Sequence, residues 1–185
     1  MMIALTGFMG SGKTTVGKVL ADFLGCPFMD LDDLVVKKAG KSIPDIFAQD
    51  GEPAFRQLEA QVLRKTVEKY AESTAVLALG GGAVLAPASA ALLHEKTVCI
   101  YLRASLDTLL ARLAGETAGR PLLQEIPDQV GDDGGSVVMP GPDRASVSAR
   151  LASREPIYEE TAHVIIDTDG LSPDEVADEI IISAL

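Results

Sequence analysis

A glycine-rich loop with a lysine and a threonine lies near the start of the sequence. The stretch "LTGFMGSGKT" contains Gly7, Gly12, Lys13 and Thr14 in the spacing G-x-x-x-x-G-K-T, directly behind a short apolar run. Glycines let backbone N–H groups turn inward around an anion, and a helix that begins near Gly12 adds unpaired N–H groups. Lys13 would supply positive charge to the outer phosphates of a nucleotide, and the Thr14 hydroxyl is a ligand for Mg²⁺. The pattern predicts a phosphate loop but leaves open a GTPase, a motor ATPase or a small-molecule kinase.

A pair of carboxylates follows the second apolar run. Asp30 and Asp32 stand in "MDLDDL". Residues two apart on an extended chain point the same way, and ligands of open α/β sheets gather at the carboxyl ends of strands, so both should face the phosphate loop. One can hold Mg²⁺, and the other can accept a proton from a hydroxyl nucleophile. The alternative is that they cap the helix that follows.

Arg56 and a run of glycines indicate a place for an acidic substrate. Arg56 lies at the start of a long predicted helix, outside its apolar stripe, and Glu59 three residues later can orient it. Gly80, Gly81 and Gly82 follow the third apolar run, where backbone without side chains allows a ligand to approach closely. The alternatives are an exposed ion pair for Arg56 and Glu59, and a plain turn for the glycines.

Other arginines are informative because the chain is acidic. The formal net charge of −11 at pH 7 opposes nonspecific binding to nucleic acid or to an anionic membrane, so we expect neither partner. Positive charge for an anionic ligand must then be concentrated locally. Arg112, Arg120 and Arg154 can either balance nearby acidic residues or converge on phosphates and a carboxylate.

Short apolar runs alternate with amphipathic segments along the chain, as is typical of βαβ units. The expected strands are residues 2–5, 27–31, 74–79, 97–102 and 163–168, and the expected helices are 13–25, 32–40, 42–51, 52–71, 88–94, 106–115 and 172–185. This alternation predicts one α/β domain with a five-stranded parallel sheet covered by helices on both faces. Residues 124–144 are rich in Gly, Pro and acidic residues and are expected to form a functional flap or a disordered segment.

The cysteines and the hydropathy suggest where the protein works. Cys26 and Cys99 stand in apolar surroundings without metal-ligand spacing, so we expect two reduced thiols in a cytoplasmic protein. The glycine loop interrupts the first apolar run, which argues against a signal peptide, and no apolar stretch is long enough to cross a bilayer.

Taken together, these motifs resemble those of the shikimate kinases over nearly the whole chain. The resemblance rests on "GFMGSGKTT", "FMDLDDLV", "SIPDIFAQDGEPAFRQLE", "LALGGGAVL", "GRPLL" and "REPIYEE". It implies transfer of phosphate from ATP, with Mg²⁺, to the 3-hydroxyl of shikimate, in the pathway to chorismate and the aromatic amino acids. It also implies a P-loop kinase fold of the nucleoside-monophosphate-kinase type, and we expect the protein to be a monomer. This fold would have a shikimate-binding subdomain at about residues 31–62 and a mobile lid at about 113–142.

The resemblance also implies roles for individual residues. Asp32 would bind the reacting hydroxyl and serve as its base, Glu59 would orient Arg56, and Arg112 would lie beside adenine. The residues expected to act in catalysis are Lys13, Asp32 and Arg120, the last as a lid arginine over the transferring phosphate. Those expected at the nucleotide are Gly10, Ser11, Gly12, Lys13, Thr14, Thr15, Arg112 and Arg120, and those at the metal are Thr14 and Asp30. Those expected at shikimate are Asp32, Arg56, Gly80, Gly81, Gly82 and Arg154.

The segment between "RPLL" and "REPIY" is longer than is usual in that family. We interpret residues 125–139 as an insertion that makes the lid longer, more acidic and more flexible. Two other functions are weighed against this one. Another small-molecule kinase, for gluconate or a nucleotide, would lack this combination of carboxylates, Arg56 and glycines. A regulatory module without catalysis would typically lose Lys13 or Asp32, and this chain keeps both.

Overall fold

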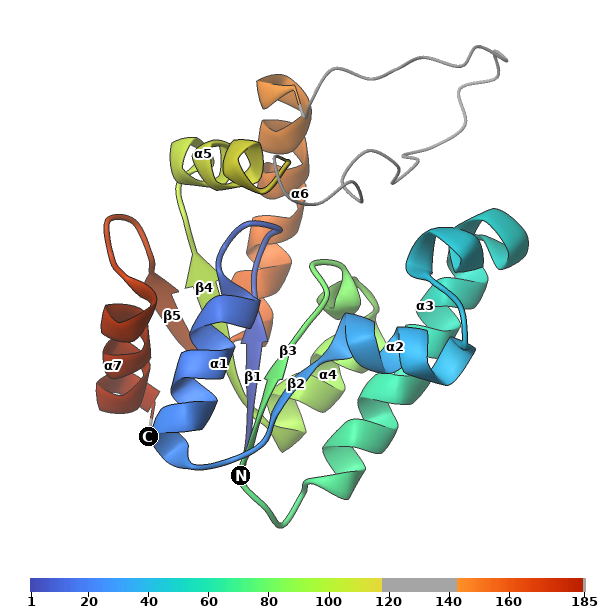
Figure 1. Ribbon diagram of the computed structural model, residues 1–185, viewed down its shortest axis with the longest axis horizontal. Coiled ribbons are helices and arrows are strands. Elements are labelled where there is room, and N and C mark those ends of the chain that lie inside the picture. The colour runs from blue at the N-terminus through green and yellow to red at the C-terminus, as the bar shows by residue number, and fades with distance from the viewer. Residues whose placement is uncertain (118–142, 185) are drawn as a thin grey trace.

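Five parallel strands form the centre of the computed structural model, which describes residues 1–117 and 143–184 (Figure 1). They are β1 (Met2–Thr6), β2 (Phe28–Asp30), β3 (Ala75–Ala78), β4 (Val98–Arg103) and β5 (Val164–Asp167). Their order across the sheet is β2-β3-β1-β4-β5, and every pairing is parallel. The predicted five-stranded parallel sheet is therefore confirmed.

Helices cover both faces of the sheet. They are α1 (Lys13–Leu24), α2 (Leu31–Ala39), α3 (Ile43–Lys69), α4 (Pro87–Lys96), α5 (Leu106–Thr117), α6 (Arg144–Thr161) and α7 (Pro173–Ala184), with a 3₁₀ turn η1 (Ala83–Leu85). Figure 1 shows α1 and α7 side by side on one face, and these two helices are in contact. Helices α3, α4 and α6 cover the other face, which gives the three layers that the alternating pattern predicts.

The side chains of β1 alternate between two hydrophobic cores, one on each face. Ile3 and Leu5 pack with apolar residues of α1 and α7, whereas Met2 and Ala4 pack with those of α3, α4 and α6. All five residues of this strand are buried. A strand buried on both faces is apolar throughout, which explains why it reads as a continuous apolar run in the sequence.

The carboxyl ends of β1, β2 and β3 meet at one edge of the sheet because these strands are parallel neighbours. The phosphate loop follows β1, Asp30 is the last residue of β2, and the glycine run follows β3. The motifs are far apart in sequence, but the topology brings them to one edge.

The long segment after Ser42 is divided as the sequence predicts. Ser42 is the N-cap of α3, and its hydroxyl accepts a hydrogen bond from the backbone N–H of Asp45 at 3.3 Å. Gly51 interrupts the helical backbone with φ 81° and ψ 168°, and Arg56 follows shortly after this break. The glycine tolerates a positive φ that would strain other residues, so the second part of α3 begins in a new direction.

Helix α6 is an element that the sequence does not predict. Residues 124–144 are expected to be irregular, and no element is expected between them and the fifth strand. Arg120 and the insertion at 125–139 lie outside the described residues, as does most of the predicted lid at 113–142.

Among the residues that are described, no helix has the length and apolar character needed to cross a bilayer.

Thr6 presents a buried hydroxyl at the end of β1. Its Oγ1 is the one buried side-chain polar atom of the described residues that has no hydrogen-bond partner. A buried hydroxyl without a partner costs about 1–3 kcal/mol, so Thr6→Val should raise the free energy of unfolding by about 1 kcal/mol, measured by urea denaturation. Thr66→Val is the matched control, because the Thr66 hydroxyl donates to the carbonyl of Val62 at 2.8 Å and its removal should give no gain. A lower stability for Thr6→Val would contradict this interpretation.

Candidate active site

The predicted phosphate loop turns sharply between β1 and α1. Gly7, Gly10 and Gly12 have φ angles of 144°, 79° and 94°, a backbone conformation that residues with a Cβ rarely adopt. The ammonium group of Lys13 donates to the carbonyls of Gly7 at 2.9 Å and of Phe8 at 2.8 Å. The loop therefore has the backbone shape of an anion cradle, with a positive charge held against it.

Thr14 and Asp30 come together beside this loop. The Thr14 hydroxyl donates to Asp30 Oδ2 at 2.9 Å, and Asp30 Oδ1 accepts from the backbone N–H of Asp32 at 3.0 Å. Asp30 is thus also the N-cap of α2, so both predicted roles of this carboxylate are compatible. A hydroxyl and a carboxylate oxygen suit Mg²⁺, which is usually bound by few protein oxygens together with water and phosphates. Within residues 1–117 and 143–184, no group of three or more His, Cys, Asp or Glu is arranged to hold a metal ion.

Asp32 lies between the phosphate loop and the glycine run. A Cβ on Gly80 would stand 2.7 Å from Asp32 Oδ1 and 3.1 Å from Glu59 Oε1, so only glycine leaves room for these two carboxyl groups. Burial, followed by the charges of Asp30 and Glu59, raises the pKa of Asp32 to about 6, although Lys13 acts in the opposite direction. A carboxylate with such a pKa is charged at neutral pH and is a competent proton acceptor.

Arg56 is held against the glycine run by Glu59. Its guanidinium donates to Glu59 Oε2 at 2.9 Å, and Glu59 is only 4% exposed. Burial raises the pKa of Glu59, whereas Arg56 opposes that shift. A Cβ on Gly82 would lie 2.6 Å from both terminal nitrogens of Arg56. The alternative of an ordinary exposed ion pair is therefore wrong, and the glycine makes room for the arginine.

Helix α6 brings Arg154 close to the phosphate loop and to Tyr158. The Arg154 guanidinium lies 6.0 Å from the ring centroid of Phe8 in the phosphate loop. The Tyr158 hydroxyl donates to the carbonyl of Gly81 at 2.6 Å. Burial raises the pKa of this phenol, and both Arg154 and Arg56 act against the shift, so both guanidinium groups lie near one hydroxyl. Arg154 and Arg56 therefore both lie near the Tyr158 hydroxyl, which contacts the glycine run at Gly81.

Arg112, on α5, joins the phosphate loop to the turn after β5. Its guanidinium donates to the carbonyls of Gly10 at 3.4 Å and Ser11 at 3.3 Å, and to the hydroxyl and carbonyl of Thr168, each at 3.1 Å. The side chain is therefore fixed at its tip by two separate segments.

A groove of about 390 Å³ lies next to Arg112. Gly12 and Thr15 line it from the loop and α1, and Leu171 and Pro173 line it from the segment that leads into α7. Its apolar wall and its position beside the phosphate loop suit the base of a nucleotide.

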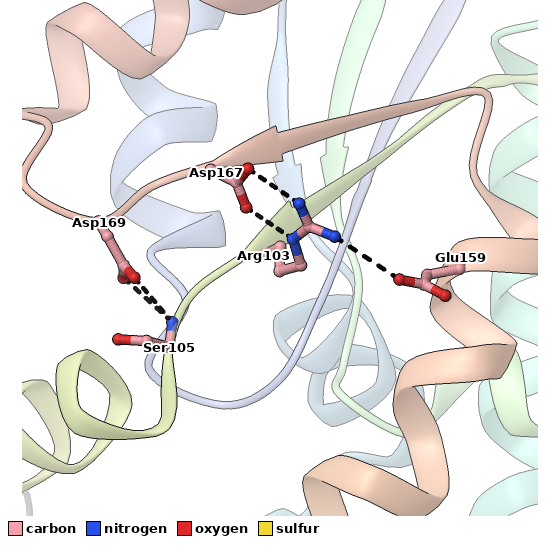
Figure 2. Close-up of polar contacts among 5 residues, drawn as sticks. All are labelled: Arg103, Ser105, Glu159, Asp167 and Asp169. Atoms are coloured by element: carbon pink, nitrogen blue, oxygen red, sulfur yellow. Dashed lines mark hydrogen bonds and ion pairs between the residues drawn. The ribbon is translucent and has the colours of Figure 1, made fainter.

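Ion pairs and hydrogen bonds at the ends of β4 and β5 hold in place α5 and α6, the helices that carry Arg112 and Arg154 (Figure 2). Arg103 donates to both carboxylate oxygens of Asp167, at 2.6 and 2.9 Å, and lies 3.7 Å from Glu159 of α6. The backbone N–H of Ser105, just before α5, lies 3.0 and 3.2 Å from the oxygens of Asp169. Arg103 holds the pKa of Asp167 below its usual value. These contacts connect the sheet to α5 and α6.

Comparison with known proteins identifies the family. The family model described as shikimate kinase matches residues 9–184. The chain belongs to the shikimate kinase family. A shikimate kinase from Salinibacter ruber is 44% identical over 91% of this chain and 78% of its own length. One from Enterococcus faecalis is 39% identical over 97% of this chain and 95% of its own length.

The fold agrees with solved structures of the same family. A shikimate kinase from Acinetobacter baumannii in complex with shikimate has a TM-score of 0.79 and 33% identity, with 97% of this chain and 90% of that chain covered. The chain is thus a P-loop kinase that uses ATP with Mg²⁺, as shikimate kinases do. This membership favours a shikimate kinase over the two alternatives, another small-molecule kinase and a noncatalytic module.

Tyr158 is a residue of this shikimate kinase site that the sequence-based prediction missed. The signal was present in "REPIYEE", because Arg154 and Tyr158 are four residues apart and share one face of a helix. Tyr158→Phe removes only the hydroxyl that holds the Gly81 carbonyl. We expect the KM for shikimate to rise by about 5- to 10-fold with kcat changed less than twofold, since one neutral hydrogen bond contributes about 1 kcal/mol.

Steady-state kinetics measure this change. Tyr70→Phe is the control, because Tyr70 is the C-cap of α3 and lies about 20 Å along that helix from Arg56. An equal fall in kcat and kcat/KM would contradict a positioning role for Tyr158, because it would place the hydroxyl in the chemical step.

Proposed function

We propose that this kinase transfers the terminal phosphate of ATP to the 3-hydroxyl of shikimate, in the pathway to chorismate and the aromatic amino acids. The observation that carries this proposal is the placement of Arg56 and Arg154 around the glycine run, beside the Asp32 carboxyl group. A substrate with one carboxylate and one reacting hydroxyl matches such a site, since the arginines can take the carboxylate and Asp32 the hydroxyl.

The acceptor would be held by side chains and by backbone. The proposed contacts are Asp32, Arg56, Gly80, Gly81, Gly82 and Arg154. Glu59 keeps the Arg56 fork in one orientation, which lowers the entropy lost when a carboxylate binds. Residues 31–62, which include α2 and α3 as far as Val62, would then be the substrate-binding subdomain.

Asp32 is the proposed base. Its carboxylate would accept the proton of the 3-hydroxyl as the oxygen attacks the phosphorus, and it would also orient that hydroxyl. The pKa of about 6 supports this role, because the group is charged at neutral pH and yet basic enough to accept a proton.

The donor would be held by the phosphate loop. Backbone N–H groups from Gly10 to Thr15 and the Lys13 ammonium would bind the phosphates, Thr14 and Asp30 would hold Mg²⁺, and Arg112 would line the place of the base. When bound, Mg²⁺ neutralises charge on the phosphates. The role of Arg120 over the transferring phosphate stays a prediction from the resemblance.

We also propose that the protein acts as a cytoplasmic monomer on small molecules, without nucleic acid or membrane partners. Two free cysteines and a net charge of −11 support this view.

A coupled assay of ADP release with ATP, Mg²⁺ and one acceptor at a time tests the proposed substrate. We expect shikimate to stimulate ADP release at least about 100-fold over ATP alone, because an acceptor that fills the site replaces water as the nucleophile. Gluconate and nucleoside monophosphates should give only the background rate. Equal stimulation by gluconate, or none by shikimate, would contradict the proposal.

A further inference from the structure

A second groove lies on α2 and α3, away from the site described above. It has a volume of about 390 Å³ and an apolar floor formed by Leu34, Leu58 and Val62. Four lysines also line it: Lys37, Lys38, Lys65 and Lys69. The volume falls in the range of small-molecule sites, which commonly have an apolar lining and a few charged groups.

This groove is separate from the substrate contacts of α3. In a helix with 3.6 residues per turn, Leu58, Val62, Lys65 and Lys69 fall on one stripe, and Arg56 points to the opposite side. An occupant of this groove therefore does not have to compete with a carboxylate bound by Arg56.

The charge at this groove is opposite to that of the molecule. The chain carries a net charge of −11, yet four of its sixteen Lys and Arg residues line this one groove. None of these four ammonium groups makes an ion pair with any residue in the described ranges, 1–117 and 143–184. Lys69 contacts the ring of Tyr70, at 5.0 Å from its centroid.

Helix ends account for only part of this cluster. Lys37 and Lys38 lie in the last turn of α2, and Lys69 lies in the last turn of α3, where positive charge favours the helix dipole. Lys65 lies a full turn before that end and has no such role. Four like charges around an apolar floor repel one another, and an anion with an apolar body would remove that repulsion.

We propose that the groove binds a small organic anion with an apolar body and two or more carboxylate, phosphate or sulfonate groups, and that this binding alters the affinity for shikimate. The apolar body would lie on Leu34, Leu58 and Val62, and the acidic groups would reach the lysines. A pocket of this size suits such a molecule better than a protein segment, which would need a larger contact area.

The coupling follows from the two helices that form the groove. Asp32 lies in the first turn of α2, and Arg56 and Glu59 lie on α3. An occupant that favours one spacing of α2 and α3 also favours one distance between Asp32 and Arg56, so it changes the free energy of shikimate binding. The binding claim does not depend on the proposed reaction, whereas the coupling claim rests on the proposed substrate.

A naphthalene disulfonate, an aromatic body with two anionic groups, is a suitable probe. Its Kd is measured by isothermal titration calorimetry with ADP and shikimate present, so that the first site is filled. We expect binding to the unmodified chain and a Kd about tenfold higher for Lys65→Gln/Lys69→Gln, which keeps the aliphatic stems but removes two charges. The control, Lys18→Gln/Lys96→Gln, changes the net charge equally at exposed sites elsewhere and should keep the original Kd.

Two further measurements complete the test. Inorganic sulfate and naphthalene without acidic groups should each bind at least about tenfold more weakly than the disulfonate, because each lacks one half of the interaction. The disulfonate should change the KM for shikimate of the unmodified chain at least about twofold and leave that of Lys65→Gln/Lys69→Gln unchanged. Equal Kd values in the two double variants would overturn the site, and an unchanged KM would overturn the coupling. Sedimentation could instead show that the unmodified chain self-associates and that Lys65→Gln/Lys69→Gln does not. That result would identify a second copy of the chain as the occupant and overturn the proposal.

Discussion

Asp32→Asn should lower kcat/KM for shikimate by about 1,000-fold, since a positioned general base contributes about 10²- to 10⁴-fold. Asparagine has nearly the same shape and can still accept a hydrogen bond, but it cannot take the proton of the hydroxyl. This carboxyl group makes none of the predicted nucleotide contacts, so the Kd for ATP, measured by calorimetry, should change less than about threefold. The Asp32→Asn substitution therefore separates an effect on the chemical step from an effect on nucleotide binding.

The pH dependence of the same enzyme provides a second readout. Asp32 must be charged to accept a proton, and burial together with Asp30 and Glu59 raises its pKa to about 6. The kcat/KM for shikimate should be constant above that pH and should fall about tenfold per pH unit below it. The residual activity of Asp32→Asn should lack this fall.

Asp33→Asn is the control for this prediction. Asp33 lies in the first turn of the same helix but is exposed, and it carries the same charge. The Asp33→Asn variant should keep nearly full activity. A rate for Asp32→Asn within about threefold of the unmodified enzyme would contradict the role of Asp32 as base.

Arg56→Gln/Glu59→Gln should raise the KM for shikimate by about 100-fold, with a much smaller change in kcat. Charge-assisted hydrogen bonds contribute about 1.5–3 kcal/mol each, and about 1.4 kcal/mol corresponds to a factor of ten. Both members of the pair are changed because Glu59 is buried, and removal of the arginine alone would leave an unpaired buried charge. Steady-state kinetics measure the effect, and circular dichroism verifies that the variant is folded.

Arg64→Gln is the matched control for this pair. Arg64 lies on the same helix, is exposed and makes no ion pair with a described residue. Its removal should leave the KM within about twofold, as is usual for exposed charges. An unchanged KM in Arg56→Gln/Glu59→Gln would show that the carboxylate binds elsewhere.

The strands and the phosphate loop were predictable from the sequence because each leaves a local signal. Buried parallel strands are continuous apolar runs, and the glycines of the loop stand where φ is positive. Parallel topology then places Asp30 and the glycine run at one edge, so their proximity followed from the fold class alone.

Helix α6 left a much weaker signal. Within it only Val147, Tyr158 and Thr161 are buried, and Pro156 interrupts the helical pattern. With so few apolar positions, the period of 3.6 residues is hard to detect. For the same reason the sequence does not reveal the Tyr158 hydroxyl that donates to the Gly81 carbonyl, whereas the resemblance identifies Arg154.

The structure was also needed to explain why glycine stands at positions 80 and 82. The sequence predicts that Gly80 and Gly82 allow close approach of a ligand, and in the described residues they also make room for Asp32, Glu59 and Arg56. Such contacts join residues from different elements, so no pattern within one segment can reveal them.

A crystal structure with ADP and shikimate tests the central claim most directly. We expect the carboxylate of shikimate between Arg56 and Arg154, and its 3-hydroxyl within hydrogen-bond distance of Asp32 on the side that faces the phosphate loop. A carboxylate bound away from both arginines, or a 3-hydroxyl that does not reach Asp32, would contradict this account.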